Sequence, residues 1–103
     1  MTIEQMEAAW SFGPQFYPRE LAELLKIRPL IAKALIDKLH VQSVKCAVGR
    51  VYHTADFFMR LRRQPHLVHW AKVQNEVYNI SETQLSLELG SGFPPYYTAR
   101  NNR

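Results

Sequence analysis

Cysteine, glycine and long apolar runs are all scarce in this chain of 103 residues. The single cysteine, Cys46, cannot form a disulfide within the chain, so the cytoplasm is the expected compartment. No apolar run approaches the roughly 20 residues that span a bilayer, and we expect no membrane contact. The first ten residues carry Glu4 and Glu7 but no lysine or arginine, and therefore lack the basic start of a secretory signal.

The composition also argues against an enzyme. Hydrophobic residues make up 47% of the chain and charged residues 21%, which excludes a wholly disordered protein. A chain of this length buries one modest core and leaves little room for a deep substrate cleft. The four glycines are too scattered for a phosphate-binding loop, and no pair of carboxylates stands out. We therefore expect a protein without catalytic residues and without a cofactor.

Positive charge is concentrated in one segment. The net charge of the chain is +4, yet residues 18–63 carry ten lysines and arginines against four acids, a net of +6. Residues 1–17 carry a net charge of −2, and residues 64–103 are balanced. Such an asymmetry favours a polyanionic partner. The charge excess taken alone is equally compatible with a solvated lysine-rich surface.

Capping residues and prolines divide the first part of the chain into short helices. A capping box at Thr2–Gln5 predicts a helix at the N-terminus. Pro18 and Pro29 suit the first position of a helix, because the missing N–H has no partner there, and they predict helices over 18–25 and 29–39. The apolar spacing predicts that the inward faces of these two helices consist of Leu21, Leu24, Leu25, Ala32, Leu35, Ile36 and Leu39.

The segment 41–53 is rich in valine and tyrosine and predicts a β-hairpin. Its turn is expected near Ala47-Val48-Gly49, where the glycine supplies the positive φ that a tight hairpin needs. Thr54 is expected to cap a helix over 55–63, with Asp56 in its first turn.

The remaining chain predicts two further helices and a tail. Pro65 ends the preceding helix, and a helical pattern follows over 66–78. A second capping box at Ser81–Gln84 predicts a separate short helix that ends at Gly90. We therefore expect one domain over residues 1–90 and a flexible tail over 91–103.

Two short helices, a hairpin and a further helix follow one another in the order of a winged helix-turn-helix. The segment 18–37 resembles the helix-turn-helix of excisionase-like and MerR-like regulators, with the small residue Ala22 in the first helix and matching apolar residues at Leu21, Leu25, Ile27, Ala32 and Leu35. The segment 47–57 is similar to the wing of that family, in which Val-Gly-Arg leads into an aromatic strand. The resemblance covers about residues 16–63. Lys26 departs from it, because the family often has glycine in this turn.

The resemblance implies a mainly α-helical fold with a small β-hairpin wing, and helical extensions at both ends. It also implies a DNA-binding surface made of Arg19, Arg28, Leu30, Lys33, Lys38, Gln42, Lys45 and Arg50. Arg28 and Lys33 would enter or flank the major groove, and Leu30 would contact a thymine methyl. Lys38 and Gln42 would lie near the DNA backbone.

On the hairpin, Lys45 and Arg50 would meet a phosphate or the adjacent minor groove, and Arg19 lies near a helix N-terminus that can hold a phosphate. Among the outward-facing residues of the helix 29–39 and the residue that precedes it, only Arg28 has the chemistry that reads base edges well. Phosphate contacts are therefore better supported than base contacts.

We therefore expect a small transcriptional regulator, of a kind common on phages, prophages and plasmids, that binds double-stranded DNA as a homodimer. Two alternatives remain open. One is an excisionase-like factor that bends DNA for a recombinase. The other is a protein-binding adaptor or inhibitor that contacts its partner through Leu30, Ile31 and the C-terminal segment 93–97.

Other motifs indicate little. Cys46 with His40 or His53 lacks an oxyanion hole, and the strand pattern favours a buried small side chain. His66 and His69 share a helix face, but two histidines do not close a metal site, and no metal is expected. The segment 94–97 reads Pro-Pro-Tyr-Tyr and matches a WW-domain ligand over only four residues.

Overall fold

The computed structural model describes residues 1–89, with side chains described as far as Asn79. The elements are α1 (Ile3–Ala9), β1 (Gln15–Phe16), α2 (Pro18–Leu25), α3 (Pro29–Leu39), β2 (Ser43–Cys46), β3 (Gly49–His53), α4 (Thr54–Arg63) and α5 (His66–Leu89). The chain is thus mainly helical with one small antiparallel sheet, and the expected bounds of α2 and α3 are confirmed. The expected tail at 91–103 lies outside the described residues.

The ends of the early helices follow from their sequences. The Thr2 hydroxyl accepts from the Gln5 N–H while the Gln5 side chain accepts from the Thr2 N–H, which confirms the capping box of α1. Proline occupies the first turn of both α2 and α3. The chain leaves α2 through Lys26, which is left-handed at φ 58° although it is not a glycine.

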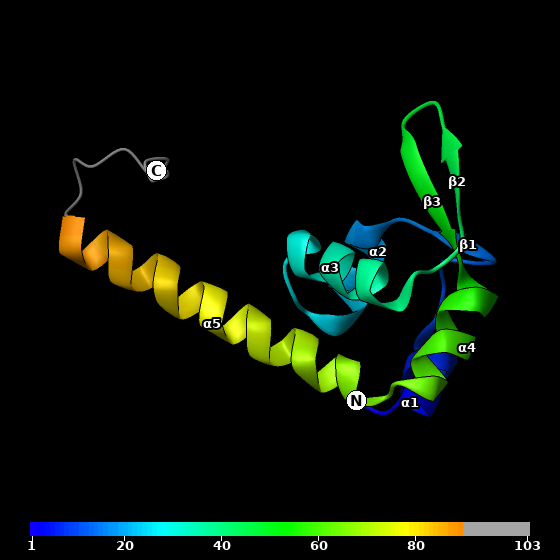
Figure 1. Ribbon diagram of the computed structural model, residues 1–103, viewed down its shortest axis with the longest axis horizontal. Helices are drawn as coiled ribbons and strands as arrows, with labels where there is room; N and C mark the ends of the chain where they lie inside the picture. The colour runs from blue at the N-terminus through cyan, green and yellow to red at the C-terminus, as the bar shows by residue number, and fades with distance from the viewer. Residues whose placement is uncertain (90–103) are drawn as a thin grey trace.

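The sheet has the strand order β1-β3-β2. β2 and β3 form the expected hairpin, with Cys46 opposite Gly49 across a turn at Ala47 and Val48, and Gly49 has a φ of +135°. β1 adds two residues at the base of the hairpin, where Phe16 pairs with Tyr52. The outer half of the hairpin projects beyond the helices (Figure 1).

The core is continuous from α1 to the start of α5. All four residues expected on the inward face of α3 are buried, together with Ile31. Leu21 and Leu25 of α2 are buried as expected, and Leu24 packs partly against them. An aromatic cluster surrounds Trp10, whose ring centroid lies 5.0 Å from that of Phe16. Phe57 and Phe58 of α4 complete this cluster.

Two expectations about helix ends are wrong. Thr54 does not cap α4 with its side chain: it is the first helical residue, and its hydroxyl donates to the Gly13 carbonyl at 2.8 Å. The separate helix expected after Ser81 does not exist either, because α5 runs without a break from His66 to Leu89. No glycine or proline stands between these two residues, so nothing stops the helix at its internal capping sequence.

α5 is the longest element and extends well past α3 (Figure 1). Its first turns are part of the core through Leu67, Val68 and Ala71, and they pack along α3. Within residues 1–89, no helix is both long enough and apolar enough to cross a membrane.

Candidate nucleic-acid interface

α3 presents one side to the core and another to solvent. The turn before it is closed by a hydrogen bond from the Ile27 N–H to the Ala22 carbonyl at 3.0 Å, and Ala22 is itself buried. A small side chain at this position lets α2 and α3 approach closely. The exposed side of α3 carries Leu30, with 64% of its surface accessible, and Asp37 and Lys38 further along.

Lys33 lies at the edge of this exposed side and is paired within the helix. Its ammonium donates to the two carboxylate oxygens of Asp37 at 2.9 and 2.8 Å, and both side chains remain about half exposed. This hydrogen bond raises the pKa of Lys33, and the nearby Tyr52 of β3 raises it further. Lys33 is therefore charged at neutral pH, and its ammonium lies near Tyr52 of the hairpin.

Arg28 does not point along the exposed side of α3. Its backbone N–H donates to Oδ1 of Asn75 at 2.9 Å, and its Nε donates to Oδ1 of Asn79 at 2.9 Å. Its guanidinium also lies 4.6 Å from the ring centroid of Tyr78. All three partners belong to α5, so Arg28 is half buried against that helix.

At the other end of α3, Lys38 contacts α5 as well. Its ammonium lies 4.8 Å from the ring centroid of Trp70, within the range of a cation–π interaction. Trp70 is near the start of α5, whereas Asn79 is more than two turns later. α5 therefore runs antiparallel to α3 and contacts a cationic side chain at each end of it.

The hairpin carries two cations directly opposite one another. Lys45 of β2 pairs with Arg50 of β3 in the antiparallel register, and both side chains are exposed. Arg50 donates to the Ser43 hydroxyl at 2.8 Å. Within the described part of the chain, neither residue has a carboxylate partner. Like charges in this arrangement repel, and an anion between them would relieve that repulsion.

Gln42 and Arg19 are the last two residues expected at the interface, and both are exposed. Gln42 is exposed between α3 and β2, and its backbone N–H donates to Asp56 at 2.8 Å. Arg19, in the first turn of α2, stacks over the Tyr17 ring at 4.4 Å. The structure thus leaves Lys33 on α3, Gln42 just after it, and Lys45 and Arg50 on the hairpin. Arg28 and the ammonium of Lys38 are instead turned toward α5.

Two further arginines of the basic segment, Arg60 and Arg62, are held within the fold. Arg60 donates to Asp56 at 2.8 Å and also contacts the Leu39 carbonyl at 3.4 Å. Arg62 forms an ion pair with Glu7 of α1. These contacts fix α4 against its neighbours. Part of the positive charge of residues 18–63 therefore has a role within the fold and does not require a nucleic-acid partner to account for it.

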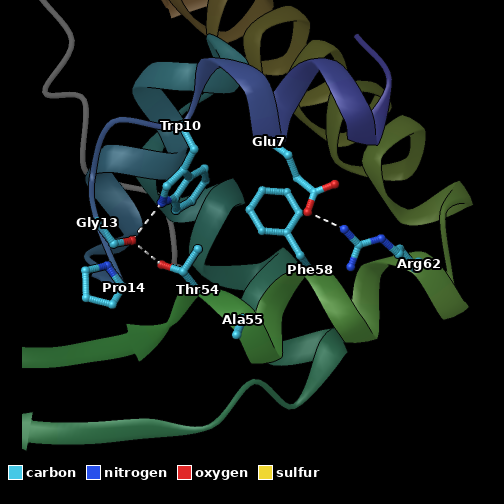
Figure 2. Close-up of a pocket in the computed structure, with 8 residues that line it drawn as sticks. All are labelled: Glu7, Trp10, Gly13, Pro14, Thr54, Ala55, Phe58 and Arg62. Atoms are coloured by element: carbon cyan, nitrogen blue, oxygen red, sulfur yellow. Dashed lines mark hydrogen bonds and ion pairs between the residues drawn. The ribbon is translucent and has the colours of Figure 1, made fainter.

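A hollow of about 560 Å³ lies between α1 and α4, away from α3. Figure 2 shows Trp10 and Phe58 on its walls and the Glu7–Arg62 pair at one end. At the other end, the carbonyl of Gly13 accepts hydrogen bonds from Trp10 Nε1 at 3.1 Å and from the Thr54 hydroxyl at 2.8 Å. The polar groups of this hollow thus bind one another and tie the base of the hairpin to α1.

The thiol of Cys46, which was considered above for catalysis, lies beside a tyrosine. Cys46 is half buried rather than fully buried, and its Sγ lies 3.6 Å from the Tyr17 hydroxyl. The hydrogen bond between them raises the pKa of Tyr17. Among the residues that the structure describes, no three histidine, cysteine or acidic side chains gather as a metal site.

Asn75, Tyr78 and Asn79 are the residues at this interface that sequence reasoning missed. They lie 47 to 51 positions after Arg28, and no local pattern links them to it.

Comparisons of this chain with models of protein families, with curated proteins and with solved structures found no match.

Proposed function

We propose that this chain is a winged helix-turn-helix protein that binds double-stranded DNA. The observation that carries the proposal is the exposed side of α3, with Leu30 and the half-exposed Lys33, together with the projecting hairpin. α3 would lie in the major groove, and the hairpin would follow the DNA backbone as the wing. The opposed cations Lys45 and Arg50 would then bracket a phosphate.

The chemistry of this surface favours affinity over sequence readout. Its charged residues are mostly lysines, which contact phosphates as point charges, and Leu30 is the exposed apolar residue on α3. We propose that the protein acts as a small transcriptional regulator of the phage, prophage or plasmid type. It would block or recruit other proteins at a promoter through binding alone, with no chemical step.

We further propose that the protein binds DNA as a homodimer joined along α5. Trp70, Val73 and Val77 follow the alternating spacing of a coiled-coil seam, and Val73 and Val77 are 40% and 51% exposed. The same spacing continues in the sequence at Ile80, Gln84 and Leu87. Val73 and Val77 lie on a different side of α5 from the buried Leu67 and Ala71, whereas Trp70 also packs against the core. One helix would therefore pack against α3 and against a second copy.

The proposed DNA binding is tested by measuring affinity for a mixed-sequence duplex at several salt concentrations. Each phosphate contact contributes about −0.9 to the slope of log K against log salt. Lys45→Ala combined with Arg50→Ala should therefore reduce the steepness of that slope by about 2, if each residue neutralises one phosphate. Arg63→Ala combined with Lys72→Ala removes the same charge from α4 and α5 and serves as the control.

A second candidate function is supported by the exposure of apolar residues. Leu30 on α3 and Val48 at the hairpin turn are 64% and 81% accessible. A protein partner would cover such residues and use the fold as an adaptor. The salt series separates the two functions, because binding through apolar contacts changes little as salt rises, and no duplex binding at low salt would favour the adaptor.

A further inference from the structure

Arg28 is the one residue at the start of α3 with strong base-reading chemistry, yet its side chain is bound to α5. Asn79 accepts from its Nε, and the Tyr78 ring lies against its guanidinium. The neighbouring Leu30 is 64% exposed while Arg28 is half buried, so α5 draws the guanidinium away from the exposed side of α3.

We propose that α5 competes with DNA for Arg28, so that Asn79 and Tyr78 restrain DNA binding in the free protein. The inference rests on the proposed DNA-binding function and adds a control element to it. When a duplex occupies the α3 surface, the guanidinium leaves Asn79 and binds the DNA through a phosphate or a guanine edge.

The difference in charge between the Asn79 amide and a DNA phosphate favours this exchange. Asn79 offers a neutral amide oxygen, whereas a phosphate carries a negative charge and therefore binds the positively charged guanidinium more strongly. An arginine also fits the paired acceptors of guanine in the major groove. The net free energy of DNA binding is nevertheless smaller than the new contacts alone would give, because the contacts with Asn79 and Tyr78 are lost when the new ones form.

Asn75 has a different role from Asn79. It accepts from the backbone N–H of Arg28 and thereby fixes the start of α3 against α5. That contact does not involve the guanidinium and is kept when the side chain moves. The restraint on DNA binding is therefore assigned to Asn79 and Tyr78, and Asn75 is left unchanged in the test.

The test measures the affinity of the full-length protein for a mixed-sequence duplex by fluorescence anisotropy at moderate salt. Asn79→Ala is expected to tighten binding by about two- to tenfold, which is the range for loss of one solvent-exposed hydrogen bond. Tyr78→Leu, which keeps the apolar volume but removes the ring, should act in the same direction. Gln74→Ala removes a carboxamide from the same helix and should leave the affinity unchanged.

The effect of Asn79→Ala is then measured again in a variant that lacks the Arg28 side chain, Arg28→Ala. If α5 acts through Arg28, Asn79→Ala has no effect on affinity once Arg28 is absent. An equal gain in both backgrounds would overturn the proposal, because α5 would then act by some other route. Unchanged or weaker binding of Asn79→Ala in the normal background would also overturn it. Failure of the unaltered protein to bind the duplex at low salt would instead reject the DNA-binding function itself.

Discussion

The carboxylate of Asp56 accepts a 2.8 Å hydrogen bond from the backbone N–H of Gln42, and in this way α4 holds the start of the hairpin. The same carboxylate binds Arg60 one turn later on α4. Arg60 in turn contacts the carbonyl of Leu39 at the end of α3. One acidic side chain therefore fixes the relative positions of α3, the hairpin and α4. The first two of these elements form the proposed DNA-binding surface.

Loss of Asp56 is expected to destabilise the fold. Asp56→Ala leaves the Gln42 N–H without its acceptor and Arg60 without its partner, and hydrogen bonds to charged groups are worth about 1.5–3 kcal/mol. The free energy of unfolding, measured in urea at pH 7, should fall by about that amount. Asp37→Ala is the matched control, because its ion pair with Lys33 is exposed on both sides and contributes under about 1 kcal/mol. Equal losses in the two variants would contradict this role for Asp56.

Asp56 also predicts how stability depends on pH. The hydrogen bond from Gln42, followed by the contact with Arg60, lowers the pKa of Asp56 in the folded protein below its unfolded value. The folded state therefore binds fewer protons, and the stabilisation is present above the unfolded pKa and is lost as pH falls through the folded pKa. Urea unfolding at a series of pH values below about 5 should show this loss. The loss should be smaller in Asp56→Ala than in the unaltered protein.

Lys26→Gly is expected to stabilise the protein. Lys26 ends α2 with φ 58° and ψ 48°, a conformation that glycine adopts without the steric cost paid by other residues. The free energy of unfolding should rise by about 0.5–1 kcal/mol, measured by thermal or urea denaturation. Lys26→Ala removes the same charge but keeps the Cβ, so it should give no gain. A gain with alanine would show that charge, rather than backbone conformation, limits stability here.

Asp37→Asn is expected to strengthen DNA binding. Asp37 places a negative charge on the exposed side of α3 and binds the Lys33 ammonium at 2.8 Å. Removing that charge frees Lys33 for one phosphate, which should steepen the salt dependence by about 0.9 in the logarithmic slope. Anisotropy titrations at several salt concentrations measure this. Glu23→Gln removes one acid from the exposed side of α2 and should have a smaller effect.

The exposed seam of α5 predicts a self-association that charge should disrupt. Val73→Lys combined with Val77→Lys places two like charges on each copy where the proposed dimer buries apolar surface. Sedimentation velocity should show a dimer for the unaltered protein and at least a roughly tenfold weaker association for the variant. Glu76→Lys changes the charge of the same helix outside the seam and is the control. A monomer at all concentrations for the unaltered protein would remove the proposed dimer.

Much of the fold was accessible from the sequence because its signals are local. Pro18 and Pro29 begin their helices, Gly49 permits the hairpin, and the buried face of α3 follows from helical spacing. Each of these features depends on residues within one or two turns of one another, where steric and hydrogen-bonding preferences act directly.

The order of α1 to α4, the bounds of α2 and α3 and the positive charge of residues 18–63 therefore follow from the sequence. The partners of the polar side chains depend instead on tertiary packing. The Thr54 hydroxyl binds Gly13 instead of capping α4, and Arg28 binds Asn79 instead of facing outward. In both cases the partner is more than 40 residues away, and the choice among polar partners depends on which groups packing brings within hydrogen-bonding distance.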